Sequence, residues 1–382
     1  MGELAIDNDL SVSIFINGIK LSNLNSKISR LILSESISNE IASIQIDVLL
    51  RNEFMVRPVT DGSIVDFSVN FPSHIIGSSH KKVSRFRVYY YEAHEVSNEI
   101  GLQYSISAMV DSYYKLNTIE ENVHDSTSSA VFQSIASMNN ISSDTVGTND
   151  KQIWFPADGN KINFLRHTCL HAWKDRDSVF CWWIDRYNYL CLKNFTDLIR
   201  GETKWIFIHN RKEDSLTKTN TILINSIRYL SSSGENNTAE GYGKLQTYFD
   251  TISNKRNTIN INNFYSGSEG LNINADVCKP MKYNQVGILS TNVHKNYIEA
   301  ELQNKRGRTL YSVFVECYSS TINDVLLGDT VYYEMSLGSE IDVKIYTGKY
   351  IVIGIETSFI GRNCMTKYTL AKQGIGISLS GE

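Results

Sequence analysis

The sequence predicts an α+β protein that is mostly β, with two related small antiparallel β-barrels, an intervening α+β domain and an insertion. Three observations predict this fold. Short apolar runs alternate with a period of two in the first hundred residues, the same pattern returns after residue 221, and helical periodicity is confined to the middle. Only 4 prolines and 21 tyrosines, together with many Ile, Val and Thr residues, also favour β-structure.

The first domain is expected over residues 1–112, as a small β-barrel. Residues 12–16 alternate and stop at Asn17-Gly18, the strongest two-residue signal for a hairpin. Further alternating runs predict strands over residues 44–50, 65–69, 86–90 and 102–110. Several short strands separated by turn residues indicate a small antiparallel barrel or sandwich.

An α+β domain is expected over residues 113–214. Asp125 or Ser126 can cap a first helix, whose apolar face carries Val131, Ile135 and Met138.

A second helix of this domain is expected after residues 158–160. Its apolar side is formed by Ile162, Leu165, Cys169, Ala172 and Trp173. A hairpin follows, with strands over 179–184 and 189–195 around a turn at 185–188.

The strand pattern resumes in the last third of the chain. We expect the second barrel at residues 215–232 and 296–372, an insertion or outer domain at 233–295, and a C-terminal arm at 373–382. In the arm, Ile375, Ile377 and Leu379 alternate next to two glycines, so we expect them to bind a neighbouring chain.

An internal repeat links the two β-rich regions. Segments 61–67, 86–95 and 103–108 each have a counterpart near the C-terminus, at 327–333, 348–357 and 367–371. Both sets contain a glycine turn, a strand, a long strand and a closing strand that begins with Tyr. Chance similarity between two β-segments is the alternative to a duplicated barrel.

Composition and charge exclude several classes of protein. The formal net charge is -4 and no block of five like charges occurs, which argues against a dedicated nucleic-acid binder. We see neither a signal peptide nor an apolar run of about 18 residues, so no membrane anchor is expected and the chain should fold in a cytoplasm. The 6 scattered cysteines are expected to be reduced and buried.

Candidate metal and catalytic groups each have a plainer interpretation. His167 and His171 lie near Cys169, but helical geometry turns both rings away from it, so we expect exposed histidines, a core cysteine and no metal. His94-Glu95 begins like a zinc-protease motif but lacks the second histidine, and Gly241-Tyr242-Gly243 lacks the third glycine of a dinucleotide loop.

Two acidic pairs, Glu120-Glu121 and Asp175/Asp177, are the candidates for glycosidase carboxylates. Such acids are usually solvated, so we expect no catalytic residues, no cofactor and no enzyme.

Two further clusters are candidates for binding. Lys305, Arg306 and Arg308 form the densest basic cluster, interpreted as a solvated hairpin tip, with a phosphate or partner contact as the alternative. Trp182-Trp183 place one ring on each face of a strand, which indicates a two-sided core strand rather than a platform for bases or sugars.

With this layout, the chain resembles the central hub proteins of contractile-tail baseplates, a family that includes phage late-control tail proteins, and the N-terminal half of type VI secretion spike proteins. The resemblance covers most of residues 10–372 apart from 233–295. The segments that carry it are Val12-Ser13-Ile14-Phe15-Ile16-Asn17-Gly18, Ile44-Gln45-Ile46-Asp47-Val48, Asp61-Gly62-Ser63-Ile64-Val65, Gln152-Ile153-Trp154-Phe155, Asn163-Phe164-Leu165-Arg166, Trp182-Trp183-Ile184-Asp185 before Tyr189-Leu190, and Leu327-Gly328-Asp329-Thr330-Val331 to Ile355.

The resemblance implies a homotrimer in the tail baseplate of a virion, made in the cytoplasm of a bacterial host. Three chains with two barrels each would adapt a threefold spike to a sixfold tail tube. The implied partners are the tail spike protein, which would be a separate chain, the tail tube protein and other baseplate (wedge) proteins. DNA would pass through the central channel without specific binding. A peptidoglycan-processing enzyme or a carbohydrate-binding module of the same assembly is the alternative.

Overall fold

The computed structural model describes most of the chain. The described residues are 4–7, 10–21, 27–50, 59–71, 80–95, 101–156, 159–209, 220–231, 244–251, 253–261, 281–289, 293–310, 313–335, 346–360 and 363–372. The C-terminal arm, with Ile375, Ile377 and Leu379, lies outside them.

The N-terminal strands form one antiparallel sheet. Its central five strands have the order β6-β7-β8-β5-β4. Their bounds are β4 Lys27–Ser36, β5 Ser43–Leu50, β6 Ile64–Phe71, β7 His80–Glu95 and β8 Leu102–Val110. Strand β2 (Leu10–Ile16) extends the sheet beyond β6, and the short strands β1 (Leu4–Asp7) and β3 (Ile19–Lys20) pair with β2.

The predicted hairpin at Asn17-Gly18 is confirmed. Both residues have positive φ, 50° and 81°, which is the conformation that a two-residue turn of this kind needs and that Asn and Gly tolerate best. The turn is anchored to the sheet, because the Asn17 backbone N–H donates to the Ile64 carbonyl at 2.8 Å and its side-chain oxygen accepts from the Ile64 N–H at 3.0 Å.

The C-terminal strands form a second sheet with the order β21-β22-β23-β20-β16, again antiparallel throughout. Their bounds are β16 Ser226–Ser231, β20 Val313–Ser319, β21 Thr330–Met335, β22 Gly348–Ile360 and β23 Asn363–Lys372. Strand β14 (Trp205–His209) runs parallel to β21 and carries β15 (Thr221–Ile224), also parallel, on its outer side.

The two sheets repeat one another strand by strand. Strands β4 to β8 correspond in chain order, neighbours and direction to β16, β20, β21, β22 and β23. Equivalent rows of buried and partly buried side chains cross the two sheets. One row is Val88, Ala108, Ile44 and Leu33, and the other is Val352, Leu370, Val315 and Tyr229.

The glycine turns before β6 and β21 match in detail. Gly62 (φ 79°) donates its N–H to Val88 O, and Gly328 (φ 81°) donates to Val352 O, both at 2.8 Å. Each long strand then shifts register, after Val88 in β7 and after Val352 in β22. Among the described residues, no hydrogen-bonded ladder closes either sheet on itself, so the two barrels remain a prediction.

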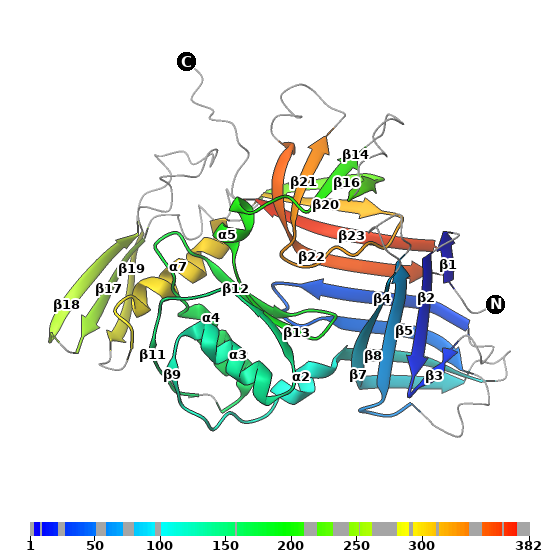
Figure 1. The fold of residues 1–382 in the computed structure, drawn as a ribbon, viewed down its shortest axis with the longest axis horizontal. Helices are drawn as coiled ribbons and strands as arrows, with labels where there is room; N and C mark the ends of the chain where they lie inside the picture. The colour runs from blue at the N-terminus through cyan, green and yellow to red at the C-terminus, as the bar shows by residue number, and fades with distance from the viewer. Residues whose placement is uncertain are drawn as a thin grey trace, which may run out of the picture.

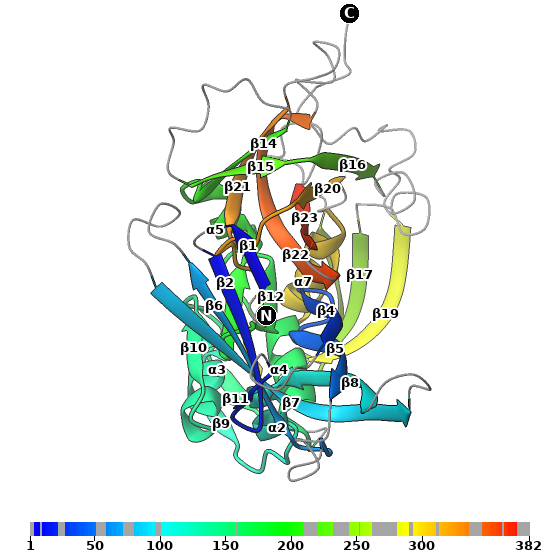
Figure 2. The same cartoon turned by 90° about the vertical axis from the view of Figure 1, so that its right-hand side faces the viewer.

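One ladder joins the two sheets into a single one. The second half of β22, Gly354–Ile360, pairs antiparallel with β4 over Arg30–Ser36. Figure 1 shows the blue strands β4 and β5 beside the orange-red strands β22 and β23, and Figure 2 shows the same neighbours from the side. Phe359 packs 6.4 Å from Phe67, between ring centroids, so β22 also completes the core of the first sheet.

The middle domain lies against this joined sheet. Its elements are α2 Asp111–Leu116, β9 His124–Ser126, α3 Ser128–Met138, β10 Ser142–Thr145, β11 Gln152–Trp154, α4 Lys161–Leu170, β12 Phe180–Ile184, β13 Tyr189–Asn194 and α5 Phe195–Arg200. The predicted second helix and hairpin are confirmed, with Asn160 capping α4 through a bond from the Ile162 N–H.

The first helix of this domain differs from the prediction in two respects. Thr127, not Asp125 or Ser126, caps α3, because those two residues pair with β11 as part of β9. Met138 is about half exposed, at 49%, since the helix ends there and its last turn leaves the core.

Strand β12 separates the two hydrophobic cores. Trp182 packs in the core of the first sheet, whereas Trp183 packs in the core of the second. Both rings are buried, so the interpretation as a two-sided core strand is confirmed. The five described cysteines are also buried, as expected, and Cys278 lies outside the described residues.

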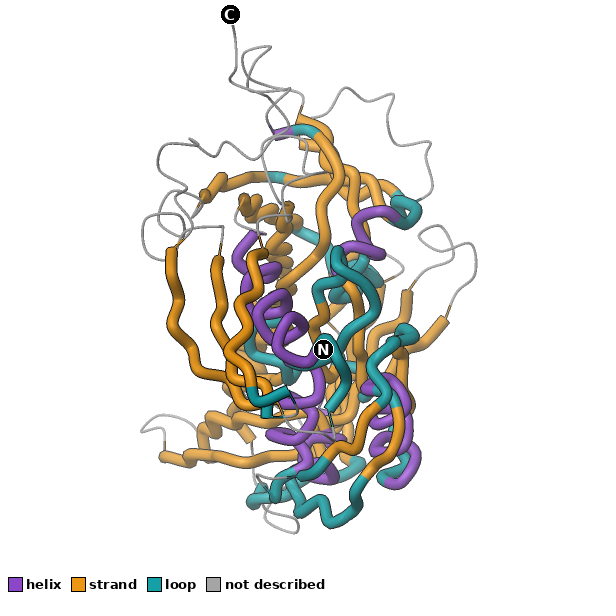
Figure 3. Tube along the Cα trace, turned by 90° about the vertical axis from the view of Figure 1, so that its left-hand side faces the viewer, coloured by secondary structure: helices purple, strands orange, loops and turns teal. Residues whose placement is uncertain are grey.

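The insertion contains a three-stranded sheet and is followed by a helix that the sequence did not reveal. The sheet has the order β18-β17-β19, with β17 Lys244–Asp250, β18 Lys255–Ile261 and β19 Met281–Leu289. Helix α7, Tyr297–Leu310, runs beside it, as Figures 1 and 3 show. None of the helices in the described ranges has the length and apolar character needed to cross a membrane.

Candidate assembly site at the junction of the sheets

A buried ion pair joins the three parts of the molecule. Arg186 lies in the turn between β12 and β13. Its Nη1 donates to Oε2 of Glu35, on β4, at 2.8 Å. Its backbone N–H donates to Glu35 Oε1 at 2.9 Å, and its Nη2 donates to Val325 O, between β20 and β21, at 2.7 Å. Burial has the largest single effect and lowers the pKa of Arg186, but the Glu35 carboxylate, Tyr187 and Asp324 together outweigh it, so the pKa is raised.

A second set of contacts lies next to this pair. Lys82 on β7 places Nζ 2.5 Å from Asp324 Oδ2, and the Tyr187 hydroxyl donates to Asp324 Oδ1 at 3.2 Å. The Lys82 ammonium also lies 4.8 Å from the centre of the Tyr187 ring. These contacts tie the first sheet to the loop before β21.

Asp185 is the titratable group of this junction. It is buried, and its Oδ1 accepts the backbone N–H groups of Tyr187 and Tyr189, each at 2.9 Å. Burial, together with the nearby Glu35 carboxylate, raises the pKa of Asp185 to about 7.

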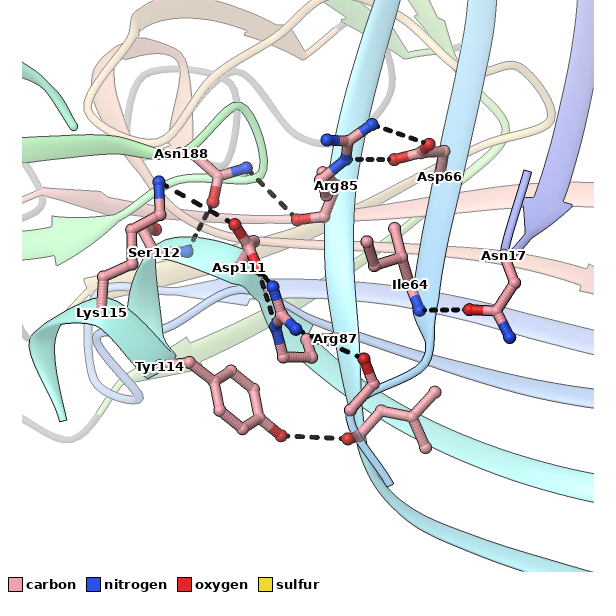
Figure 4. Close-up of polar contacts among 12 residues, drawn as sticks. Asn17, Ile64, Asp66, Arg85, Arg87, Asp111, Ser112, Tyr114, Lys115 and Asn188 are labelled. Carbon is pink, nitrogen blue, oxygen red and sulfur yellow. Dashed lines mark hydrogen bonds and ion pairs between the residues drawn. The ribbon is translucent and has the colours of Figure 1, made fainter. Parts of the chain in front are cut away.

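The first sheet and the middle domain share a third group of polar contacts, drawn in Figure 4. Arg87 on β7 donates from Nε and Nη2 to Asp111 Oδ1 at 2.8 and 2.6 Å, at the start of α2. Asn188 bridges the same region, because it accepts from the Ser112 N–H at 2.9 Å and donates to Arg85 O at 3.2 Å. The domains are therefore joined by fixed polar contacts rather than by a linker alone.

The face of the first sheet that points away from its core is polar. A shallow depression on it is lined by Arg30, Gln45, Asp47, Tyr90, Ser105, Ile106 and Ser107. The equivalent face of the second sheet carries the ion pairs Arg228–Glu316 at 3.8 Å and Lys367–Glu356 at 3.9 Å. Charges of both signs on an exposed sheet suit a surface in contact with water rather than with an apolar core.

The two histidines considered for a metal site have a structural role. His171 is buried, which contradicts the expectation of an exposed ring, because α7 covers it: the ring stacks on Tyr297 with centroids 3.7 Å apart. Burial lowers the pKa of His171 to about 3. His167 accepts or donates a hydrogen bond at 3.1 Å with the Tyr297 hydroxyl. In the described ranges, no group of three or more metal-ligating side chains occurs.

The candidate carboxylates also have structural partners. Glu120 is buried rather than solvated, and its Oε1 accepts the Asn122 backbone N–H at 2.9 Å, which offsets part of the cost of burial. Asp175 accepts the Asp177 N–H at 3.0 Å, and Asp177 lies 3.3 Å from Arg200. Trp182 and Trp183 are buried and cannot offer a ring face to a sugar.

The basic cluster lies on helix α7, so its interpretation as a hairpin tip is wrong. Lys305 is exposed and its Nζ lies 2.5 Å from Glu301 Oε1, one turn earlier on the same helix. Arg306 and Arg308 belong to the same helix.

Solved structures of tail proteins share this architecture. No family model and no curated protein matches the sequence. Among solved structures, the 43 kDa tail protein of prophage MuSo2 from Shewanella oneidensis matches with a TM-score of 0.62 and 9% identity, over 95% of this chain and 98% of that one. The tail protein of Neisseria meningitidis MC58 matches with a TM-score of 0.58 and 9% identity, over 96% and 97%.

The chain has the fold of these tail proteins. A third match connects the fold to secretion systems. It is the Escherichia coli c3393 protein, a component of the type VI secretion system described as similar to the T4 bacteriophage tail proteins gp27 and gp5. It aligns with a TM-score of 0.53 and 7% identity, over 96% of this chain and 80% of that one. The resemblance inferred from the sequence is thus confirmed at the level of fold.

Proposed function

We propose that this chain is a structural hub of a contractile-tail baseplate, a homotrimer that adapts a threefold spike to a sixfold tail tube. The observation that carries the proposal is the strand-by-strand repeat of the two sheets and the β4–β22 ladder that joins them. A chain with two near-equivalent units gives six such units in a trimer, which is what a junction between threefold and sixfold structures requires.

In this proposal the two sheets belong to two small barrels, at residues 1–112 and at 215–232 plus 296–372. The six barrels surround a channel through which DNA passes. The mixed charges on the exposed sheet faces support a channel wall of this kind, since a strongly basic wall would bind the phosphates and slow their passage.

The proposed partners are the spike protein, the tail tube protein and other baseplate proteins, and the proposed location is the tail of the virion. The tail and secretion-system proteins with the same fold support this assignment. The arm with Ile375, Ile377 and Leu379, and the basic residues of α7, are the proposed contacts with neighbouring chains. The role is structural rather than enzymatic.

Deletion of the gene from a producing strain tests this function. Electron micrographs of particles from the deletion strain should lack complete tails that carry a spike, and a plasmid copy of the wild-type gene should restore them. A matched plasmid with an early stop codon is the control. Normal tails with spikes in the deletion strain would contradict the proposal.

A further inference from the structure

The second half of β7 is a sheet edge that lacks a neighbour in the described part of the chain. Residues Tyr90–Glu95 pair with β8 on one side only, because the ladder with β6 ends at Arg87. The equivalent half of β22 is different. It pairs with β23 on one side and with β4 on the other.

Exposure follows this difference in pairing. Ile355, Thr357 and Phe359 of β22 are all at most 3% exposed. Every residue from Tyr89 to Glu95 is exposed, and Tyr90 reaches 54%. A long exposed edge strand with three consecutive tyrosines is a template for pairing with another chain, and soluble proteins normally cover or interrupt such an edge.

Strand β16 is the counterpart of β4 and has the complementary edge. Leu33 of β4 and Tyr229 of β16 occupy the same position in the equivalent rows that cross the two sheets. Of the described strands, only β20 pairs with β16, whereas β4 pairs with both β5 and β22. The chain therefore contains one complete joint between sheets, the β22–β4 ladder. It also contains the two edges, on β7 and β16, that could form a second joint of the same kind.

We propose that β7 of one chain pairs antiparallel with β16 of a second copy, in the register of the β22–β4 joint. This proposal rests on the proposed trimeric function. Because Thr357 pairs with Leu33, Ala93 would pair with Tyr229, and the ladder would run from Tyr91 opposite Ser231 to Glu95 opposite Ile227.

The backbone of β7 offers the hydrogen bonds that this ladder needs. In the existing joint, the Ile37 N–H donates to the Ile353 carbonyl at 3.0 Å. Antiparallel pairs alternate between bonded and non-bonded positions, so Ile355, Thr357 and Phe359 direct their N–H and C=O groups toward β4. Their equivalents Tyr91, Ala93 and Glu95 direct the same groups toward the open edge.

The side chains at the new joint are complementary. Glu92 would lie diagonally across from Arg228, which is 66% exposed on its side chain and shares only a 3.8 Å contact with Glu316. On the opposite face, Glu95 replaces Phe359 and Tyr333 replaces Phe67. Tyr333 is already buried and its hydroxyl lies 3.0 Å from that of Tyr229, so Glu95 would lie at the margin of this core.

The geometry also explains how the assembly closes. The joint uses β7 on one chain and β16 on the next, so it is a heterologous contact that repeats around an axis. Joints within chains and between chains would alternate, and three chains would place six near-equivalent joints in one ring.

Disulfide trapping tests the register. In the full chain with Cys278→Ser, Glu92→Cys with Leu230→Cys places two thiols at a directly opposed, non-bonded pair, where Cα atoms are close enough for a disulfide. The equivalent pair within one chain, Glu356→Cys with Ser34→Cys, is the positive control. Ala93→Cys with Leu230→Cys is the register control, because a shift of one residue turns the two side chains to opposite faces.

After mild oxidation, non-reducing gels should show covalent dimers and closed trimers for the Glu92/Leu230 pair. The intrachain pair should stay at monomer size, and the shifted pair should remain uncrosslinked. If the protein is a trimer by light scattering but the Glu92/Leu230 pair does not crosslink, the proposed joint is wrong while the hub function stands. A monomer that forms no crosslink overturns both.

A proline substitution tests the hydrogen bonds independently. Ala93→Pro removes an N–H that faces the open edge and leaves the bonds of the β7–β8 ladder in place. It should shift the particle mass from trimer to monomer with an unchanged circular dichroism spectrum, whereas Ala93→Val should remain trimeric. A trimeric Ala93→Pro variant would contradict the ladder.

Discussion

Glu35 and Arg186 show how much of the junction depends on single residues. Each is almost fully buried, and together they connect β4, the β12–β13 turn and the loop that precedes β21. The sequence indicates that Glu35 needs a buried partner, although the strand pattern does not show which residue that partner is. Glu35 follows Leu31 and Leu33 at the same spacing of two, which places a carboxylate on the buried face of a strand where it needs a partner.

Removing one partner of this pair should be costly. Arg186→Met leaves the Glu35 carboxylate buried without its counter-charge, so we expect a loss of about 3–5 kcal/mol in the free energy of unfolding. Urea unfolding followed by tryptophan fluorescence measures it. Arg200→Met removes an exposed partner of Asp177 and should cost less than about 1 kcal/mol. Equal losses for the two variants would show that the junction pair is unimportant.

Asp185 should make the stability depend on pH. Its folded-state pKa of about 7 lies above the value of 3.8 for a free aspartate, so the folded chain binds the extra proton between these limits. The contribution of Asp185 to stability is therefore fully present below about pH 4 and is lost as the pH rises through 7. Asp185→Asn stays neutral and keeps the oxygen that accepts from Tyr187 and Tyr189.

Thermal unfolding at two pH values tests this assignment. The melting temperature of Asp185→Asn should exceed that of the wild type at pH 8, and this advantage should shrink at pH 5. A difference between the two proteins that does not change with pH would contradict a raised pKa at this position.

At the scale of elements, regular alternation was a reliable guide and interrupted patterns were not. The strands β2, β5, β6 and β8 alternate with a period of two over most of their length, and the sequence predicts them. Strand β4 was missed, because its register shifts between Ile28 and Arg30 and breaks the alternation. Helix α7 was missed because Gly307 indicates a turn in an isolated sequence.

Gly307 is in fact required by packing. A Cβ at this position would lie 2.1 Å from Cγ2 of Val179, the residue before β12, so α7 can approach it this closely only with a glycine. In a free helix Gly→Ala would stabilise by about 1 kcal/mol, but here Gly307→Ala should destabilise by roughly 1–3 kcal/mol. In a Val179→Ala background the same substitution should become neutral or stabilising. Chemical denaturation of the four proteins measures the coupling, and additive effects would contradict the contact.

At the scale of the whole molecule, the repeat was visible in the sequence but the joint between its copies was not. The turns at Gly62 and Gly328 and the strands after them are local patterns that can be compared by eye. The β22–β4 ladder and the Glu35–Arg186 pair connect residues far apart in the chain, and no local pattern encodes which distant strands become neighbours. For the same reason, sequence alone did not reveal the open edges of β7 and β16.

The number of chains in the assembled particle tests the central claim most directly. Native mass spectrometry of the full chain should give one species of about 130 kDa, three times the chain mass of 43.3 kDa, because three copies are needed to present six near-equivalent units. A species of 43.3 kDa that persists at high protein concentration and in the presence of the spike protein would contradict the account.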